Sequence, residues 1–171
     1  MEHNIAYFYD FAVSDMKNVR FAEIGCWKGV SVIYLTKKLI SRNTPFEVVA
    51  VDLWDLFDGN SNGEGLQKES WNIFNNNISK EGLSDLISII KNESSVSSSF
   101  FADGYFDVVF IDASHDYESV KRDITSWLPK VRKGGLIGGH DYSDSEGVRK
   151  SVHEIFGNDV NIIHGIWMKS V

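Results

Sequence analysis

Short apolar runs alternate with amphipathic segments along nearly the whole sequence, and this alternation limits the fold more than any other feature. The apolar runs are six to eight residues long, and several are rich in β-branched side chains, as is typical of buried strands. They are VRFAEIG (19–25), FEVVAVD (46–52), LISIIK (86–91), FDVVFIDA (106–113) and LIGGHD (136–141). Strands that are apolar on both faces and separated by helices predict a parallel sheet with helices on both sides.

The segments between these runs show helical periodicity or helix-end signals. The clearest is DYESVKRDITSWLPKV (116–131), in which Val120, Ile124 and Trp127 share one face. The tail contains two strand-like runs around His164-Gly165, a spacing typical of a hairpin. The stretch 53–65 is rich in Gly, Asn and Asp and is predicted to be a loop. Further helices are predicted over 30–41, 66–82, 94–100 and 145–157, with one short helix before the first strand.

Composition narrows the class of protein. At 171 residues, the chain is predicted to form one domain over 1–171, long enough to bury a core. The formal charge of −7 argues against a nucleic-acid partner, because such binders usually carry a basic face. We see no signal peptide and no apolar stretch of about 18 residues, and the single cysteine fits a reducing compartment. We therefore expect a cytoplasmic protein with no membrane partner that acts on a small molecule.

Polar residues, most of them acidic, stand at or just after the end of every predicted strand. They are Glu23, Asp52, Glu93 or Ser94, Asp112, and His140-Asp141. In a parallel sheet covered by helices, ligands bind beyond the carboxyl ends of the strands, near the point where the strand order reverses. The sequence therefore predicts a ligand site at this edge of the sheet.

The turn after the first strand, EIGCWKGVS (23–31), indicates what kind of ligand this site holds. A dinucleotide-binding turn would have the pattern Gly-x-Gly-x-x-Gly, whereas this turn has only Gly25 and Gly29 and begins with Glu23. An acid there would repel a pyrophosphate and would suit a ligand with an ammonium and a sulfonium, such as S-adenosylmethionine. Asp52 could accept both ribose hydroxyls of that ligand, although nicotinamide enzymes use the same contact.

Two motifs carry a family resemblance. The first is the turn Glu-x-Gly-x-x-x-Gly-x-Ser (23–31), and the more specific one is FDVVFIDASHDYESVKRDI followed by GGLIGGHDY. With these motifs, nearly the whole chain resembles the class I S-adenosylmethionine-dependent methyltransferases. More narrowly, it is similar to the small-molecule O-methyltransferases that include catechol O-methyltransferase and the macrolide sugar methyltransferases. The resemblance implies an α/β fold, a Rossmann-like doubly wound sheet of seven mostly parallel strands with an antiparallel C-terminal hairpin.

The resemblance also implies how S-adenosylmethionine is held. It assigns Ser31 to the methionine carboxylate, Asp52 to the ribose, and Glu93 or Ser94 to the adenine. The full set of predicted cofactor-binding residues is Glu23, Gly25, Trp27, Gly29, Ser31, Asp52, Leu53, Glu93, Ser94 and Asp112.

The predicted reacting end lies after the fourth and fifth strands. In the metal-dependent relatives, the positions of Asp112, His140 and Asp141 carry three oxygen ligands that hold Mg²⁺ against the acceptor. We predict a divalent cation, Mg²⁺ or Mn²⁺, at these residues, although an imidazole suits Mn²⁺, Fe or Zn²⁺ better than Mg²⁺. His115 stands near the position where the relatives have the base, and we predict His115 and Asp112 as catalytic residues. Alternatively, His115 is only a loop residue and Asp116 caps the next helix.

The sequence thus predicts an enzyme that transfers a methyl group from S-adenosylmethionine to a hydroxyl oxygen of a small-molecule acceptor, with help from a cation. Two alternatives stay open, a nicotinamide-dependent oxidoreductase and a non-catalytic module that keeps the nucleotide pocket. Relatives carry several extra N-terminal helices, whereas this chain has one short helical stretch before its first strand. Without those helices, the side of the site that binds the acceptor is expected to be open to solvent. Alternatively, a second subunit of a homodimer completes it.

Overall fold

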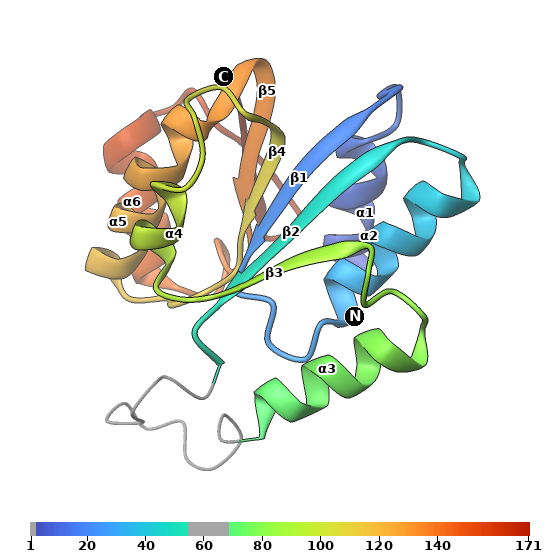
Figure 1. Cartoon of the computed structure of the whole chain (residues 1–171). Coiled ribbons are helices and arrows are strands. Elements are labelled where there is room, and N and C mark those ends of the chain that lie inside the picture. The colour runs from blue at the N-terminus through green and yellow to red at the C-terminus, as the bar shows by residue number, and fades with distance from the viewer. Residues whose placement is uncertain (1–2, 55–68) are drawn as a thin grey trace.

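The computed structural model describes residues 3–54 and 69–171, and their centre is one seven-stranded sheet (Figure 1). The strand order is β3-β2-β1-β4-β5-β7-β6. Strands β1 to β5 are parallel, and β7 runs antiparallel to both β5 and β6. The strands are β1 Val19–Ile24, β2 Phe46–Asp52, β3 Ile87–Lys91, β4 Phe106–Ile111, β5 Val131–Gly139, β6 Asn161–Ile163 and β7 Ile166–Ser170. The predicted mostly parallel sheet with an antiparallel terminal hairpin is confirmed.

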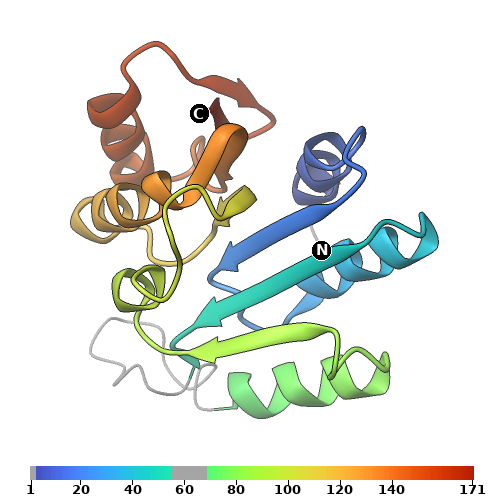
Figure 2. The ribbon, with the colours of Figure 1, turned by 45° about the horizontal axis from the view of Figure 1, so that its top comes forward.

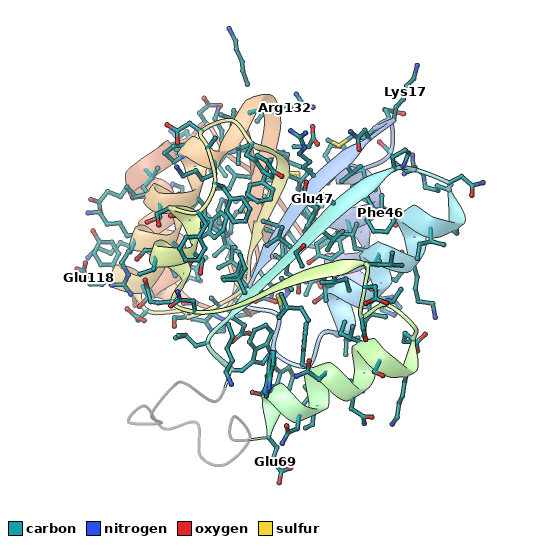
Figure 3. The ribbon with its side chains drawn as sticks, in the orientation of Figure 1. Lys17, Phe46, Glu47, Glu69, Glu118 and Arg132 are labelled. Carbon is teal, nitrogen blue, oxygen red and sulfur yellow. The ribbon has the colours of Figure 1, made fainter. Side chains whose placement is uncertain are left out.

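Helices cover both faces of this sheet (Figures 1 and 2). Helices α1, α2 and α3 pack on one face, and α5 and α6 pack on the other beside the short α4. Side chains fill the space between the helices and the sheet, while charged residues such as Lys17, Glu69 and Glu118 point outward (Figure 3). The helices are α1 His3–Ala12, α2 Val30–Ser41, α3 Ser70–Lys80, α4 Ser94–Ser98, α5 Tyr117–Trp127, the 3₁₀ turn η2 Leu128–Lys130 and α6 Glu146–Phe156.

The strands alternate their side chains between the two covered faces, which explains why they are apolar throughout. In β1, Phe21 lies in the core under α1 and α2, and the next residue, Ala22, lies in the core under α5 and α6. Val48 and Val49 in β2 divide in the same way. Because both faces are buried, the middle of each central strand is apolar, and polar residues such as Arg20 and Glu47 lie near the strand ends.

One segment differs from the sequence prediction, and another lies outside the described residues. The fifth strand begins at Val131 rather than at 136, because Val131 pairs with Phe106 before the register shifts at a bulge and resumes between Val108 and Leu136. The segment Lys-Gly-Gly at 133–135, which the sequence leaves outside the fifth strand, therefore lies inside β5 as its bulged part. Most of the predicted loop 53–65, and the first residues of the helix predicted over 66–82, lie outside the described residues.

The strand order reverses between β1 and β4, and the loops after these two strands meet there. Gly25 follows β1 with φ +86°, and a Cβ built on it would lie 2.1 Å from the backbone oxygen of Asp112, which follows β4. Only glycine combines that backbone angle with such close contact. The carboxyl ends of β1 and β4 are thus in direct contact at the position where folds of this kind bind ligands. No helix in 3–54 or 69–171 is long and apolar enough to cross a membrane.

Candidate active site at the carboxyl edge of the sheet

The carboxylate of Asp52 holds the turn between β1 and α2. Its Oδ2 accepts hydrogen bonds from the backbone N–H groups of Cys26 and Trp27, each at 2.8 Å, and its Oδ1 accepts one from Trp54 N at 2.7 Å. A carboxylate has about four acceptor positions, so roughly one remains for a ligand. Asp52 therefore fixes the backbone of this turn at the carboxyl end of β2.

Trp27 presents its side chain at this turn. The indole is 51% exposed, and the backbone has φ +43°, a left-handed conformation that is rare for a bulky residue. The bonds to Asp52 and a hydrogen bond from Trp54 Nε1 to the Trp27 carbonyl, 2.7 Å, hold this conformation. The Lys28 ammonium lies 4.1 Å from the centre of the indole ring. An uncommon backbone conformation is thus maintained by several contacts, as is frequent at binding sites.

Glu23 is buried below the turn, and its two oxygens have partners within the protein. Tyr9 Oη of α1 donates to Oε2 at 2.7 Å, and Ser31 Oγ of α2 donates to Oε1 at 2.5 Å. Burial raises the pKa of Glu23 to about 8. The hydroxyl of Ser31, which the resemblance assigns to the methionine carboxylate, is bound to Glu23 here. The buried acid therefore links helices α1 and α2 to β1.

We expect Glu23→Gln to change how stability depends on pH. A carboxyl whose pKa is higher in the folded protein binds protons more strongly when folded, so its contribution to stability is complete below about pH 4.5 and is lost as the pH rises towards 8. The free energy of unfolding should therefore fall between pH 5 and 8 by about a kcal/mol or more in the wild type, and less in the variant, as measured by urea denaturation. Parallel pH dependences would show that Glu23 ionises normally.

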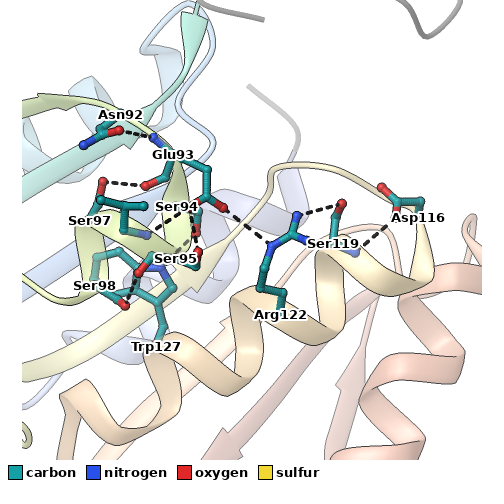
Figure 4. A network of polar contacts seen from close by, with 11 residues as sticks. Asn92, Glu93, Ser94, Ser95, Ser97, Ser98, Asp116, Ser119, Arg122 and Trp127 are labelled. Carbon is teal, nitrogen blue, oxygen red and sulfur yellow. Dashed lines mark hydrogen bonds and ion pairs between the residues drawn. The ribbon is translucent and has the colours of Figure 1, made fainter.

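The two residues predicted to hold adenine belong to a polar network between α4 and α5 (Figure 4). Glu93 caps α4 by accepting from the backbone of Val96 at 3.0 Å, and its other oxygen lies 3.5 Å from Arg122 Nε. Ser94 Oγ accepts from the indole N–H of Trp127 at 2.9 Å. Hydrogen bonds to Glu93 lower its pKa in spite of partial burial. Both residues lie at the expected edge, and both are held by neighbouring side chains.

Four residues converge at the ends of β4 and β5. Oδ2 of Asp141 lies 2.9 Å from His115 Nε2 and 3.1 Å from His140 Nδ1, and Asp112 Oδ1 lies 3.8 Å from His140 Nδ1. His140 is only 9% exposed, whereas the His115 side chain is 53% exposed. The other ring nitrogen of His140, Nε2, faces the Asn4 amide of α1 at 2.9 Å. The pairing of His115 with Asp141 is a feature that the sequence did not predict.

The charges in this cluster shift one another's pKa values. Hydrogen bonds from His115 and His140 hold the pKa of Asp141 well below its usual range. The same bond to Asp141 raises the pKa of His115 above 6.5, against the effect of burial. Burial raises the pKa of Asp112 to about 6, although His140 nearby lowers it. Asp141 is therefore ionised at neutral pH, beside a histidine that titrates above its ordinary value.

The same cluster includes a group of side chains that could ligate a metal ion. One ligand atom each from Asp112, His115 and Asp141 lies within 4.8 Å of the others. The sequence predicts His140 with Asp112 and Asp141 as ligands. In the structure the two ring nitrogens of His140 face Asn4 and Asp141, and its Nδ1 lies 3.8 Å from Asp112 Oδ1. The geometry therefore places His115 with the two aspartates.

The model of a methyltransferase domain family matches residues 22–142, which is most of the chain and includes the turn, Asp52 and the cluster after β4 and β5. The chain belongs to this methyltransferase family. Together with the strand order, the match confirms the resemblance to class I methyltransferases and makes S-adenosylmethionine the implied methyl donor. No curated protein sequence matches the chain.

Solved structures share the fold of this methyltransferase at low sequence identity. The O-methyltransferase NovP is 17% identical with a TM-score of 0.74, over 98% of this chain and 78% of NovP. Cofactor-bound Rv0187 from MTB is 18% identical with a TM-score of 0.72, over 98% of this chain and 79% of Rv0187. The [4+2]-cyclase SpnF is 16% identical with a TM-score of 0.57, over 80% of this chain and only 43% of SpnF. A cyclase among these structures shows that the fold alone does not determine the reaction.

Sequence reasoning missed two residues that contact the site from α1. Tyr9 binds Glu23, and Asn4 binds His140, yet both belong to a helix that precedes the motif-bearing part of the chain. Nothing in the local sequence distinguishes them from other polar residues of an amphipathic helix. Only the packing of α1 on the sheet brings them to the site.

Proposed function

We propose that this methyltransferase transfers the methyl group of S-adenosylmethionine to a hydroxyl oxygen of a small-molecule acceptor. The observation that supports this proposal is the pair of His115 and Asp141 at the carboxyl edge, 2.9 Å apart. A hydroxyl is a weak nucleophile until its proton is removed, and a histidine held by a carboxylate is suited to remove it. The O-methyltransferase NovP, which shares the fold, agrees with an oxygen acceptor.

In this reaction, the acceptor oxygen attacks the methyl carbon while the bond from that carbon to sulfur breaks. The electron pair of the broken bond stays on sulfur, so the sulfonium becomes the neutral thioether of S-adenosylhomocysteine. The hydroxyl proton moves to Nδ1 of His115, because Nε2 of that ring donates to Asp141. His115 then releases the proton to water. The ionised Asp141 orients the ring and stabilises its protonated form.

The cofactor in this proposal is bound at the turn between β1 and α2. The remaining acceptor position of Asp52 takes a ribose hydroxyl, and the exposed indole of Trp27 covers an apolar part of the ligand. The methionine end lies beside the switch point between β1 and β4, close to Gly25 and Asp112. Positioning of the two reactants in line would then supply much of the rate.

A divalent cation is an alternative to His115 as the group that activates the hydroxyl, and the cluster offers ligands for it. Asp112, His115 and Asp141 would hold it, and this mixed set of oxygen and nitrogen donors suits Mn²⁺ better than Mg²⁺. When bound, such an ion would lower the pKa of an acceptor hydroxyl. Because Nε2 of His115 faces the cluster, the ring would use that nitrogen for the ion in place of its bond to Asp141. The neutral ring would then carry its proton on Nδ1 and could not act as the base, so the ion itself would promote loss of the hydroxyl proton.

We expect Mn²⁺ to bind to EDTA-treated protein with a stoichiometry near one, and Asp112→Asn to weaken this binding by at least tenfold, as measured by calorimetry. Asp116→Asn is the matched control, because Asp116 caps α5 nearby and does not belong to the group. If no heat of binding is detected and EDTA leaves turnover unchanged, the cluster works as an acid–base pair without an ion.

The proposed reaction can be tested in two steps. Calorimetry with S-adenosylmethionine and with NAD first separates a methyltransferase from a nicotinamide-dependent enzyme. Release of S-adenosylhomocysteine is then measured against a panel of phenols, sugars and matched amines. Turnover with hydroxyl acceptors alone supports the proposal, turnover with amines alone overturns the assignment to oxygen, and cofactor binding without turnover on any of them favours a non-catalytic module.

A further inference from the structure

Helix α1 contacts the reacting end of the site through the side chain of Asn4. Its amide nitrogen Nδ2 lies 2.9 Å from His140 Nε2 and 3.1 Å from the backbone oxygen of His164 in the turn between β6 and β7. Its amide oxygen Oδ1 accepts from the backbone N–H of Ile5 at 2.9 Å. Asn4 thus connects the first helix, the terminal hairpin and the end of β5.

These contacts determine which way round the Asn4 amide lies. A backbone carbonyl only accepts hydrogen bonds, so the atom that faces His164 O is the NH₂ nitrogen. A backbone N–H only donates, so the atom that faces Ile5 N is the amide oxygen. Both partners favour the same orientation, and the group that Asn4 offers to His140 is therefore a donor.

The donor from Asn4 in turn determines the tautomer of His140. Nε2 of His140 accepts from Asn4, so the proton of the neutral ring lies on Nδ1 and is donated to Asp141 Oδ2 at 3.1 Å. The same Oδ2 lies 2.9 Å from His115 Nε2 and accepts from it as well. With the opposite tautomer, a lone pair of His140 would face an ionised carboxylate oxygen, and the repulsion would move Asp141 away from its place against His115.

We propose that Asn4 is a positioning residue of the active site, which fixes the proton of His140 on Nδ1 and thereby holds Asp141 in contact with His115. The tautomer rests on these contacts alone, and the effect on turnover rests on the proposed role of His115 as the base. Asn4 lies outside the matched residues 22–142, so the first helix contributes to the site from beyond the family's common part.

The first test reads the tautomer directly. Long-range ¹H–¹⁵N correlation spectra of EDTA-treated protein, recorded where histidines are neutral, should show the His140 proton on Nδ1. His153 is an internal reference with a known tautomer. Its Nδ1 faces the carbonyl oxygen of Gly157 at 3.1 Å and must donate to it, so the proton of the neutral ring lies on Nδ1 and Nε2 accepts from the Tyr142 hydroxyl at 2.6 Å. A wild-type His140 with its proton on Nε2 would overturn the inference without any variant being made.

The second test replaces the donor and keeps the shape. Asn4→Asp is nearly isosteric, places an acid in the first turn of α1 where the helix dipole favours it, and offers His140 only acceptors. We expect Nε2 of His140 to become protonated, so that the spectrum of a neutral ring with its proton on Nδ1 alone is lost while that of His153 stays. Turnover should fall about tenfold with unchanged affinity for S-adenosylmethionine. Asn75→Asp is the control, because Asn75 donates to Trp71 O within α3, and it should change neither reading.

The two kinds of failure can be told apart. If Asn4→Asp leaves Nε2 of His140 unprotonated, Asn4 does not position this ring. If the spectra change as expected but His115→Gln keeps full turnover, the tautomer assignment stands and the proposed base is wrong.

Discussion

Replacing His115 with glutamine should lower the rate of the chemical step by about 10²–10⁴ and leave the affinity for S-adenosylmethionine unchanged. The glutamine amide can still donate to Asp141 Oδ2, which His115 Nε2 meets at 2.9 Å. The variant therefore keeps the hydrogen bond and loses only the nitrogen that takes the proton. Single-turnover measurement of S-adenosylhomocysteine formation, with calorimetry of cofactor binding, separates the two effects.

The pH profile of the wild type provides an independent reading of the same residue. A general base works only when it is unprotonated, so the rate should fall as the pH falls through the pKa of His115. The hydrogen bond to Asp141 raises this pKa above 6.5, and the acidic limb should therefore lie above that value in protein without a bound ion. His153→Gln is the matched control, since His153 lies on α6 and contacts Tyr142. If the His115→Gln enzyme keeps the turnover of the wild type and the acidic limb of its pH profile, a group other than His115 takes the hydroxyl proton.

Replacing Asp52 with alanine should weaken the binding of S-adenosylmethionine by about 2–3 kcal/mol, or roughly 30- to 150-fold. The structure adds a reason to the one that the sequence gives. Besides a ribose contact, Asp52→Ala removes the acceptor of three backbone N–H groups, those of Cys26, Trp27 and Trp54. The turn then loses the bonds that hold its backbone in place, so the variant should also unfold at a lower temperature.

Two further variants separate the ligand contact from the support of the turn. Asp52→Asn keeps one carbonyl oxygen and should lie between wild type and alanine in affinity. Asp107→Ala is the control for structure alone, because Asp107 accepts from the backbone of Arg20 at 2.7 Å and from Arg132 Nε at 2.6 Å in another part of the sheet. It should lower the stability and leave the affinity unchanged. Equal affinity of Asp52→Ala and wild type in calorimetry would remove Asp52 from the cofactor site.

Much of the fold follows from the sequence because local signals and burial agree. The strands are apolar on both faces and end at polar residues, so their positions and the parallel sheet could be predicted. The hairpin turn at His164-Gly165 also forms as expected, with both residues at positive φ. The start of β5 could not be predicted, since it depends on a bulge opposite β4 that permits pairing through a glycine-rich segment.

The sequence predicts where the site lies in the fold, but it predicts few of the contacts between the side chains of the site. Acids at strand ends must meet at one edge of a parallel sheet, and Asp112 and Asp141 do so. Whether a particular side chain faces a ligand or a neighbour depends on loop conformation, which the spacing of residues does not determine. For this reason the pairing of His115 with Asp141 and the bond from Ser31 to Glu23 could not be predicted.

Helix α1 contacts the site at two separate places. Through Tyr9 it binds Glu23 and hence the turn that would hold the cofactor, and through Asn4 it binds His140 at the reacting end. A single ten-residue helix therefore contacts both the cofactor half and the reacting half of the proposed site. If one ligand shifts this helix, it changes the binding free energy of the other, and thermodynamic linkage requires the effect to be equal in both directions. Cooperativity between cofactor and acceptor would then arise in a segment that touches neither of them.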